Sequence, residues 1–391
     1  MSDHLVHEAF GPPLPPMEAA SAIGLGTVAL LMAGLMPVLL GALADDGRLS
    51  SAGIGLCACL EGLTMGIVTA LSGIVLKPVR LRWIGAAATL MLVAADLGTM
   101  WCSGGSVFLI RFLAGVPEGV LLWLAVSMIA RTEVPERWSA VFFTSFVGAQ
   151  LALALAYWAF VMPLWGTNGG YAVLALCSLP ALGFAFLAPD SYAPLPKPEG
   201  ESGAPPLRGW MALFGTLFLA GAAPAVGTYL FPLAHQAGLS ADVGRFALWI
   251  SLTAQVIAGL SATALAGRVH YFTMFVICAA GLLACWAVFD FSAPAWAFIA
   301  ANFGAGYFAI LLGPFLVPMT IEADPSRRAA LLSASTQVLA GALAPLAASQ
   351  LVDDKNAHGS LTVGVVTLVV GLAVIGALHM QASRARALAR A

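Results

Sequence analysis

The sequence predicts an all-α polytopic membrane protein with twelve transmembrane helices in two pseudo-symmetric six-helix bundles. Three observations lead to this fold class. The chain of 391 residues is 60% hydrophobic and only 9% charged, apolar runs of membrane-spanning length recur along it, and short sequence echoes repeat at half its length. A water-soluble domain could not cover its surface with so few charges. Bilayer hydrocarbon is therefore the expected solvent of this surface.

The apolar runs account for all twelve predicted helices. A helix needs about 20 apolar residues to cross the roughly 30 Å hydrocarbon layer. Runs of this kind lie at 21–44, 51–76, 84–102, 107–130, 139–162 and 170–188 in the first half, and at 209–233, 243–267, 271–289, 294–318, 329–351 and 360–381 in the second. Membrane β-strands would alternate over about ten residues, and these unbroken runs do not.

The echoes indicate that the chain is a duplication. Each recurs after 190 or 191 residues: RFLAG at 111–115 with NFGAG at 302–306, Leu49-Ser50 with Leu239-Ser240, and Pro135 and Arg137 with Pro325 and Arg327. The Pro-rich, charged segment between the halves indicates a solvated linker. We therefore predict an N-terminal tail at 1–20, six-helix bundles at 21–190 and 209–385, and a linker at 191–208.

The basic residues predict the orientation, because Lys and Arg favour the cytoplasmic side of short loops. With the N-terminus inside, one face collects Lys77, Arg80, Arg82, Arg131, Arg137, Lys197, Arg208, Arg268, Arg327, Arg328, Arg384, Arg386 and Arg390, and the other has Arg48, Arg245 and Lys355. Both termini and the linker are thus expected in the cytoplasm. We expect a multi-pass protein of a bacterial inner membrane, without a cleaved signal peptide because the first 20 residues lack a basic start.

Several function classes are disfavoured. This charge distribution offers no nucleic-acid surface, and no enzyme motif such as HExxH or a phosphate-binding loop occurs. The six cysteines form neither a disulfide framework nor a zinc pattern, and no three histidines converge within a segment. We expect no metal, no cofactor and no enzymatic activity.

Two motifs resemble those of the major facilitator superfamily of secondary transporters. Arg111-Phe-Leu-Ala-Gly115 is similar to the family's RxxxG signature, and the loops RTEVPERWSA (131–140) and EADPSRRAAL (322–331) are similar to its basic Pro-x-Arg connections. The resemblance covers about residues 21–385. It implies the family's fold, with substrate bound in a central cavity between the two bundles.

The resemblance fails at two places. In the loop after the second predicted helix, Lys77 stands where the family usually carries an aspartate, so a gating latch built on that carboxylate is not expected. The fifth helix lacks the Gly-Pro motif that drug/proton antiporters of the family share, which disfavours drug export. Import and export both stay open.

Four charged residues lie deep within the predicted spans, away from the loops, and all are in the first half: Glu61, Asp96, Arg111 and Glu118. A charge at the bilayer centre costs at least about 2.5 to 3.5 kcal/mol, so such residues usually face a partner or a watery cavity. Asp96 and Arg111 lie at similar depth, and an ion pair between them is expected. Arg111 and Glu118 share a helix face but lie about 10 Å apart along the axis, so we expect no direct contact.

These residues predict a proton-coupling cluster. A buried carboxylate with an intermittent cationic partner binds and releases a proton as that partner moves. Glu118 is the first candidate carrier and Glu61 the second, with Arg111 tuning both and Asp96 pairing with it. The alternative is a permanent structural ion pair.

The second half retains the helix but not the charges, because Arg111 aligns with Asn302 and Glu118 with Ala309. Deep uncharged polar residues are therefore the substrate candidates: Gln150, Tyr229, Gln255, Asn302, Tyr307 and Gln337. Their alternative role is an interhelical hydrogen bond, worth about 0.6 kcal/mol on average.

The sequence thus predicts a monomeric, proton-coupled secondary active transporter for a small organic solute, working by alternating access. Two alternatives remain. One is a facilitator that needs no proton, and the other is a non-transporting membrane sensor on the same fold.

Overall fold

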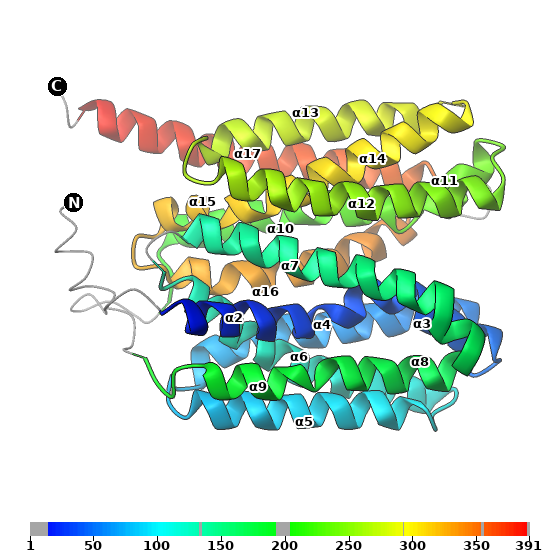
Figure 1. Cartoon of the computed structure of the whole chain (residues 1–391). Coiled ribbons are helices and arrows are strands. Elements are labelled where there is room, and N and C mark those ends of the chain that lie inside the picture. Colours follow the sequence, from blue (N-terminus) through cyan, green and yellow to red (C-terminus); the bar gives the residue numbers. More distant parts are fainter. Residues whose placement is uncertain (1–14, 133–134, 193–203, 292, 353–355, 389–391) are drawn as a thin grey trace. The chain divides into compact units, whose positions relative to one another are not determined.

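The computed structural model describes residues 15–132, 135–192, 204–291, 293–352 and 356–388 (Figure 1). By internal contacts the chain divides into one unit of Met1–Trp138 with Ser145–Pro198 and a second of Ser139–Thr144 with Glu199–Ala391. The predicted linker at 191–208 falls mostly outside the described residues, so its bounds stay a prediction.

The described residues are helical almost throughout. The first unit contains α2 (Pro16–Ala29), α3 (Leu31–Asp45), α4 (Ser51–Val75), α5 (Leu81–Thr99), α6 (Gly105–Ile129), most of α7 (Pro135–Ala156), the π-helix η1 (Tyr157–Val161), α8 (Met162–Ser178) and α9 (Pro180–Leu187). The second contains α10 (Leu207–Gly227), α11 (Leu230–Gln236), α12 (Ala241–Leu265), α13 (Tyr271–Asp290), α14 (Ala295–Leu312), the 3₁₀ turn η2 (Gly313–Phe315), α15 (Leu316–Ala323), α16 (Arg328–Ser349) and α17 (Gly359–Leu388).

These helices confirm the predicted all-α polytopic class. Eleven apolar helical stretches in the described residues are long enough to cross a membrane, and one of them, Arg137–Leu187, has 51 residues. At about 1.5 Å per residue that stretch is long enough to cross twice. It breaks at Gly166, whose φ of 61° and ψ of −163° are not helical, between the fifth and sixth predicted spans. Ten stretches that cross once and this one that crosses twice would give the predicted twelve crossings.

The two ends of the helical region differ from the prediction. The first helix begins at Pro16 rather than residue 21, because a proline at the start of a helix loses no hydrogen bond there. The last helix continues to Leu388 rather than residue 381. Its final segment, ASRARAL, is rich in residues that favour helix.

The repeated Leu-Ser pair occupies equivalent structural positions in both units. Ser50 and Ser240 are the N-caps of α4 and α12, and their hydroxyls accept hydrogen bonds from the amides of Gly53 and Val243. These caps satisfy backbone donors that would otherwise be unpaired. The Leu-Ser echo therefore marks where the second helix of each repeat begins.

The glycine of the RFLAG and NFGAG echo allows two helices to touch in each unit. A Cβ added to Gly115 on α6 would lie 2.6 Å from the backbone oxygen of Glu61 on α4, and one added to Gly306 on α14 would lie 2.7 Å from that of Ser251 on α12. Glu61 and Ser251 are themselves 190 residues apart. The duplication thus preserves one close helix contact, of the small-residue type common in membranes.

Arg48 links two helices at the predicted outer side of the first unit. Its guanidinium donates to the carbonyls of Thr99 and Cys102, at the C-terminus of α5, and to Oδ1 of Asn168 on α8. A cation is favourable at a helix C-terminus, where carbonyls lack partners. Because α5 also packs along α8 and α9 (Figure 1), these bonds help to fix the position of the helix that carries Asp96.

Replacing Gly115 by alanine tests this close contact. We expect Gly115→Ala to lower the free energy of unfolding by about 1–3 kcal/mol, because the new methyl group overlaps the α4 backbone. Gly148→Ala on α7 is the matched control, because a Cβ there meets nothing within 4 Å. Denaturant titration in detergent micelles measures both, and equal stability of the two variants would contradict the assignment.

Candidate functional site

Arg111 lies at the centre of a buried ionic cluster in the first unit. It is 0% exposed on α6. Its Nε donates to Glu61 Oε2 at 2.9 Å, and its Nη2 to the other oxygen of the same carboxyl group, while Nη1 donates to Asp96 Oδ1 at 2.8 Å. Such bidentate geometry is among the strongest that a guanidinium and a carboxylate can form. The expected pair between Asp96 and Arg111 is confirmed.

Glu118 corrects one expectation. Its Oε1 lies 3.8 Å from Arg111 Nη2, although we expected no direct contact between two residues seven apart on one helix. The axial separation holds for the backbone, but a long arginine side chain spans most of it. Glu118 is nevertheless the most loosely held of the three acids.

Glu61 and Glu118 share one nitrogen of the guanidinium. Both carboxyl groups contact Nη2 of Arg111, and a hydrogen bond between two carboxyl groups would require a proton on one of them. Both side chains are buried, at 0% and 3% exposed. The cluster thus contains a pair of acids suited to sharing one proton.

Helix α8 contributes two residues that the sequence did not indicate. Ser178 Oγ donates to Asp96 Oδ2 at 3.5 Å, and the ring of Tyr171 lies 6.0 Å from the guanidinium carbon of Arg111. Both lie in the sixth predicted span, where a serine and a tyrosine carry no charge to attract notice. Only their position beside α5 and α6 reveals the contacts.

The second unit holds no counterpart of these charges. The positions that correspond to Glu61, Asp96, Arg111 and Glu118 are Ser251, Trp286, Asn302 and Ala309. The asymmetry expected from two of these pairs therefore extends to all four. Among the described residues, no group of three or more His, Cys, Asp or Glu could hold a metal ion.

The predicted substrate residues have varied surroundings. In the first unit Gln150 Nε2 donates to the carbonyl of Leu30 at 2.6 Å, where α2 ends and α3 begins. In the second unit the Asn302 amide donates to Phe298 on its own helix, and the Tyr229 hydroxyl donates to the carbonyl of Pro345. These three residues satisfy backbone groups at helix breaks or within helices, so their role toward a substrate stays a prediction.

The other three candidates lie on the second unit and are partly exposed. Gln337 donates to Ser333 Oγ, one turn away on α16, at 3.4 Å. The Tyr307 ring packs edge-on against Phe308, and Gln255 lies half-buried on α12. Partial exposure leaves these side chains accessible, so their substrate role also stays a prediction.

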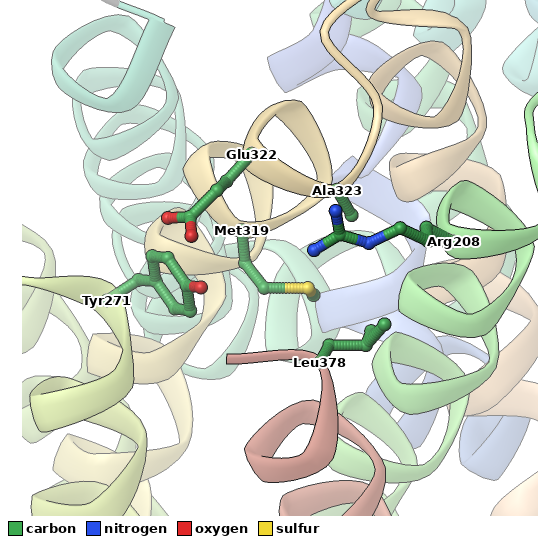
Figure 2. A pocket seen from close by; sticks show the side chains of 6 residues that line it. All are labelled: Arg208, Tyr271, Met319, Glu322, Ala323 and Leu378. Atoms are coloured by element: carbon green, nitrogen blue, oxygen red, sulfur yellow. The ribbon is translucent and has the colours of Figure 1, made fainter. Parts of the chain in front are cut away.

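A small pocket lies at the predicted inner end of the second unit. Figure 2 shows Tyr271, Glu322 and Arg208 around it, together with Met319, Ala323 and Leu378. Its volume of about 10 Å³ accommodates roughly one water molecule. This pocket is too small for an organic solute.

The loop with Lys77 uses backbone pairing in place of a carboxylate. Val79 forms an antiparallel bridge with Ser191, and the amide of Leu81 donates to the carbonyl of Asp190 at 2.9 Å. The Arg131 guanidinium lies over the Tyr192 ring, 4.1 Å from its centroid. Burial raises the pKa of Tyr192, and the nearby Arg131 offsets only part of that rise. The phenol therefore stays neutral at physiological pH.

The Arg111 cluster makes a direct prediction for stability. We expect Arg111→Met to lower the free energy of unfolding by about 3–5 kcal/mol at pH 7, because three buried acids lose their counter-ion. The loss should be smaller at pH 5, because any acid that takes up a proton at the lower pH needs no cation. Denaturant titration in micelles at both pH values measures it.

Arg245→Met is the control, because its ion pair with Asp242 is exposed and should contribute little. A loss for Arg111→Met no greater than that of the control would contradict the burial of the cluster.

Comparison with known proteins identifies the fold. No family model and no curated protein matches the sequence. Among solved structures, the chain is similar to the major facilitator superfamily transporter FucP in the outward conformation, with a TM-score of 0.71 and 12% identity over 92% of this chain and 98% of that one. It is also similar to the proton:xylose symporter XylE bound to 6-bromo-6-deoxy-D-glucose, with a TM-score of 0.66 and 13% identity over 91% and 93% of the two chains. The chain therefore has the fold of the major facilitator superfamily transporters.

Proposed function

We propose that this protein is a proton-coupled secondary active transporter that moves a small organic solute across a membrane by alternating access. The observation that carries the proposal is the Arg111 cluster, in which three buried acids share one guanidinium. The fold supports solute transport in general, and one of the two similar proteins is named as a proton symporter. Neither neighbour is an enzyme by name, and we propose no enzymatic activity.

The charge of the cluster favours proton exchange over a fixed structural role. Three carboxylates and one guanidinium carry a formal charge of −2 when all are ionised, and such an excess is costly where lipid and protein exclude water. Binding protons lowers that cost. A structural ion network would be expected to match its charges, whereas this one retains surplus acids.

Glu118 is the proposed proton carrier and Glu61 the second. Arg111 binds Glu61 and Asp96 closely and Glu118 at 3.8 Å, so a small shift of the guanidinium changes its interaction with Glu118 first. When Arg111 approaches, the ionised form of Glu118 is favoured and its proton leaves. When Arg111 withdraws, Glu118 takes up a proton again.

The second unit is proposed to supply most of the solute contacts, because the corresponding positions there are uncharged. Gln255, Asn302, Tyr307, Gln337 and Tyr229 are the proposed contacts, with Gln150 from the first unit. We further propose that the protein acts as a monomer in a bacterial inner membrane with both termini in the cytoplasm, as its basic residues favour.

A thermal screen can find the solute. Sugars including xylose, amino acids and organic cations are added to purified protein at two pH values, and a ligand that binds the folded state raises its melting temperature. Stabilisation that changes with pH is expected of a coupled substrate.

Neutralising Glu118 separates coupled transport from facilitated diffusion. In proteoliposomes, a gradient of one pH unit should drive about tenfold accumulation if one proton moves with each solute. Glu118→Gln should reduce accumulation to equilibrium while exchange of labelled for unlabelled solute continues at least in part. Asp46→Asn, the same chemical change at an exposed outer position, is the control and should leave accumulation intact.

Unchanged accumulation in Glu118→Gln would favour a facilitator that needs no proton. A protein that moves no screened solute, with or without a pH gradient, would favour the sensor alternative.

A further inference from the structure

Tyr171 is a fully buried tyrosine whose hydroxyl has no hydrogen-bond partner among the described residues. It lies on α8 in the first unit. Tyr157, on η1, is also fully buried, but its hydroxyl donates to the carbonyl of Gly170 at 2.6 Å. Of these two buried tyrosines, Tyr157 therefore has a hydrogen-bond partner among the described residues and Tyr171 has none.

The surroundings of Tyr171 are polar. The charged and titratable groups that interact electrostatically with it are Arg111 on α6, Glu61 and Cys57 on α4, and Asp96 on α5, with Tyr157 from η1. The guanidinium carbon of Arg111 lies 6.0 Å from the centre of its ring. The Tyr171 ring therefore lies at the edge of the proposed proton-exchange cluster.

A buried hydroxyl without a partner is unfavourable, because folding removes its hydrogen bonds to water. Buried polar groups of this kind are typically satisfied by an internal water, which needs two to four polar partners. The hydroxyl and the neighbouring carboxyl groups of Glu61 and Asp96 can supply them. A site lined only by apolar groups would stay dry, and this one is not apolar.

We propose that the Tyr171 hydroxyl binds one internal water molecule and, through it, hydrogen-bonds the acids around Arg111. Tyr171 is then a positioning residue for the proton that the cluster exchanges. The water accepts a proton from one carboxyl group as it passes another on, so it is a water molecule again after each transfer. The proton role rests on the proposed function, whereas the water site does not.

The test is an infrared pH titration of the full-length protein in lipid nanodiscs. The carboxyl C=O band reports the fraction of protonated acids and needs no solute. Tyr171→Phe removes only the hydroxyl, and we expect it to move the midpoint of the buried carboxyl signal upward by about one pH unit, because the ionised acids lose a hydrogen bond. A hydroxyl that merely packs would leave the midpoint unchanged and raise the melting temperature when removed.

Tyr157→Phe is the matched control. It also removes one buried hydroxyl, and it should lower the melting temperature through loss of the bond to Gly170 while leaving the carboxyl midpoint in place. An equal shift in both variants would overturn the proposal, since any loosening of α8 would then explain it.

A second measurement uses the wild-type protein alone. If a water is bound there, replacing H₂¹⁶O by H₂¹⁸O should shift a water O–H band that changes with the carboxyl signal. Absence of such a band would overturn the proposal even if Tyr171→Phe failed to fold.

If the midpoint shifts but proteoliposomes move no solute, the proposed function fails and the water site stands. If transport is proton-driven and the midpoint does not move, this inference alone fails.

Discussion

The interaction on which the first unit depends is that of one guanidinium with three acids in a region without bulk water. Arg111, in the middle of α6, offsets the negative charge of Glu61, Asp96 and Glu118. The helix that carries each acid must therefore hold it within reach of the guanidinium. Coulomb interactions are strong at low dielectric. Helices α4, α5 and α6 are therefore held together by a buried electrostatic contact.

The packing of this unit holds the charges within reach of each other. Gly115 allows α6 to touch α4 at the backbone of Glu61 itself, so the closest helix contact and the Arg111–Glu61 bond are neighbours. Arg48 binds the end of α5 at the carbonyl of Thr99, three residues after Asp96. The second unit retains the glycine contact at Gly306 and lacks the charges. The close helix contact is therefore common to both units, whereas the ionic cluster belongs to the first.

Much of this arrangement could be predicted from the sequence, because lipid imposes strong constraints. Apolar runs of fixed length predicted the spans, and the rarity of buried charges pointed to the four ionic residues. Side-chain reach limited the rest. The contact between Glu118 and Arg111 depends on the length of an arginine side chain, and Ser178 and Tyr171 became visible only once α8 lay beside α5. The substrate candidates lacked any such constraint. An uncharged polar residue in a membrane helix can bind a backbone carbonyl as readily as a substrate, and Gln150 does bind one.

The most direct test of the central claim is the movement of protons with the solute. Weakly buffered proteoliposomes receive, in the absence of any pH gradient, the solute found by thermal screening, and a pH electrode follows the medium. Solute movement is expected to change the external pH, with an alkaline shift for symport or an acid shift for antiport. Solute entry without any pH change would contradict it.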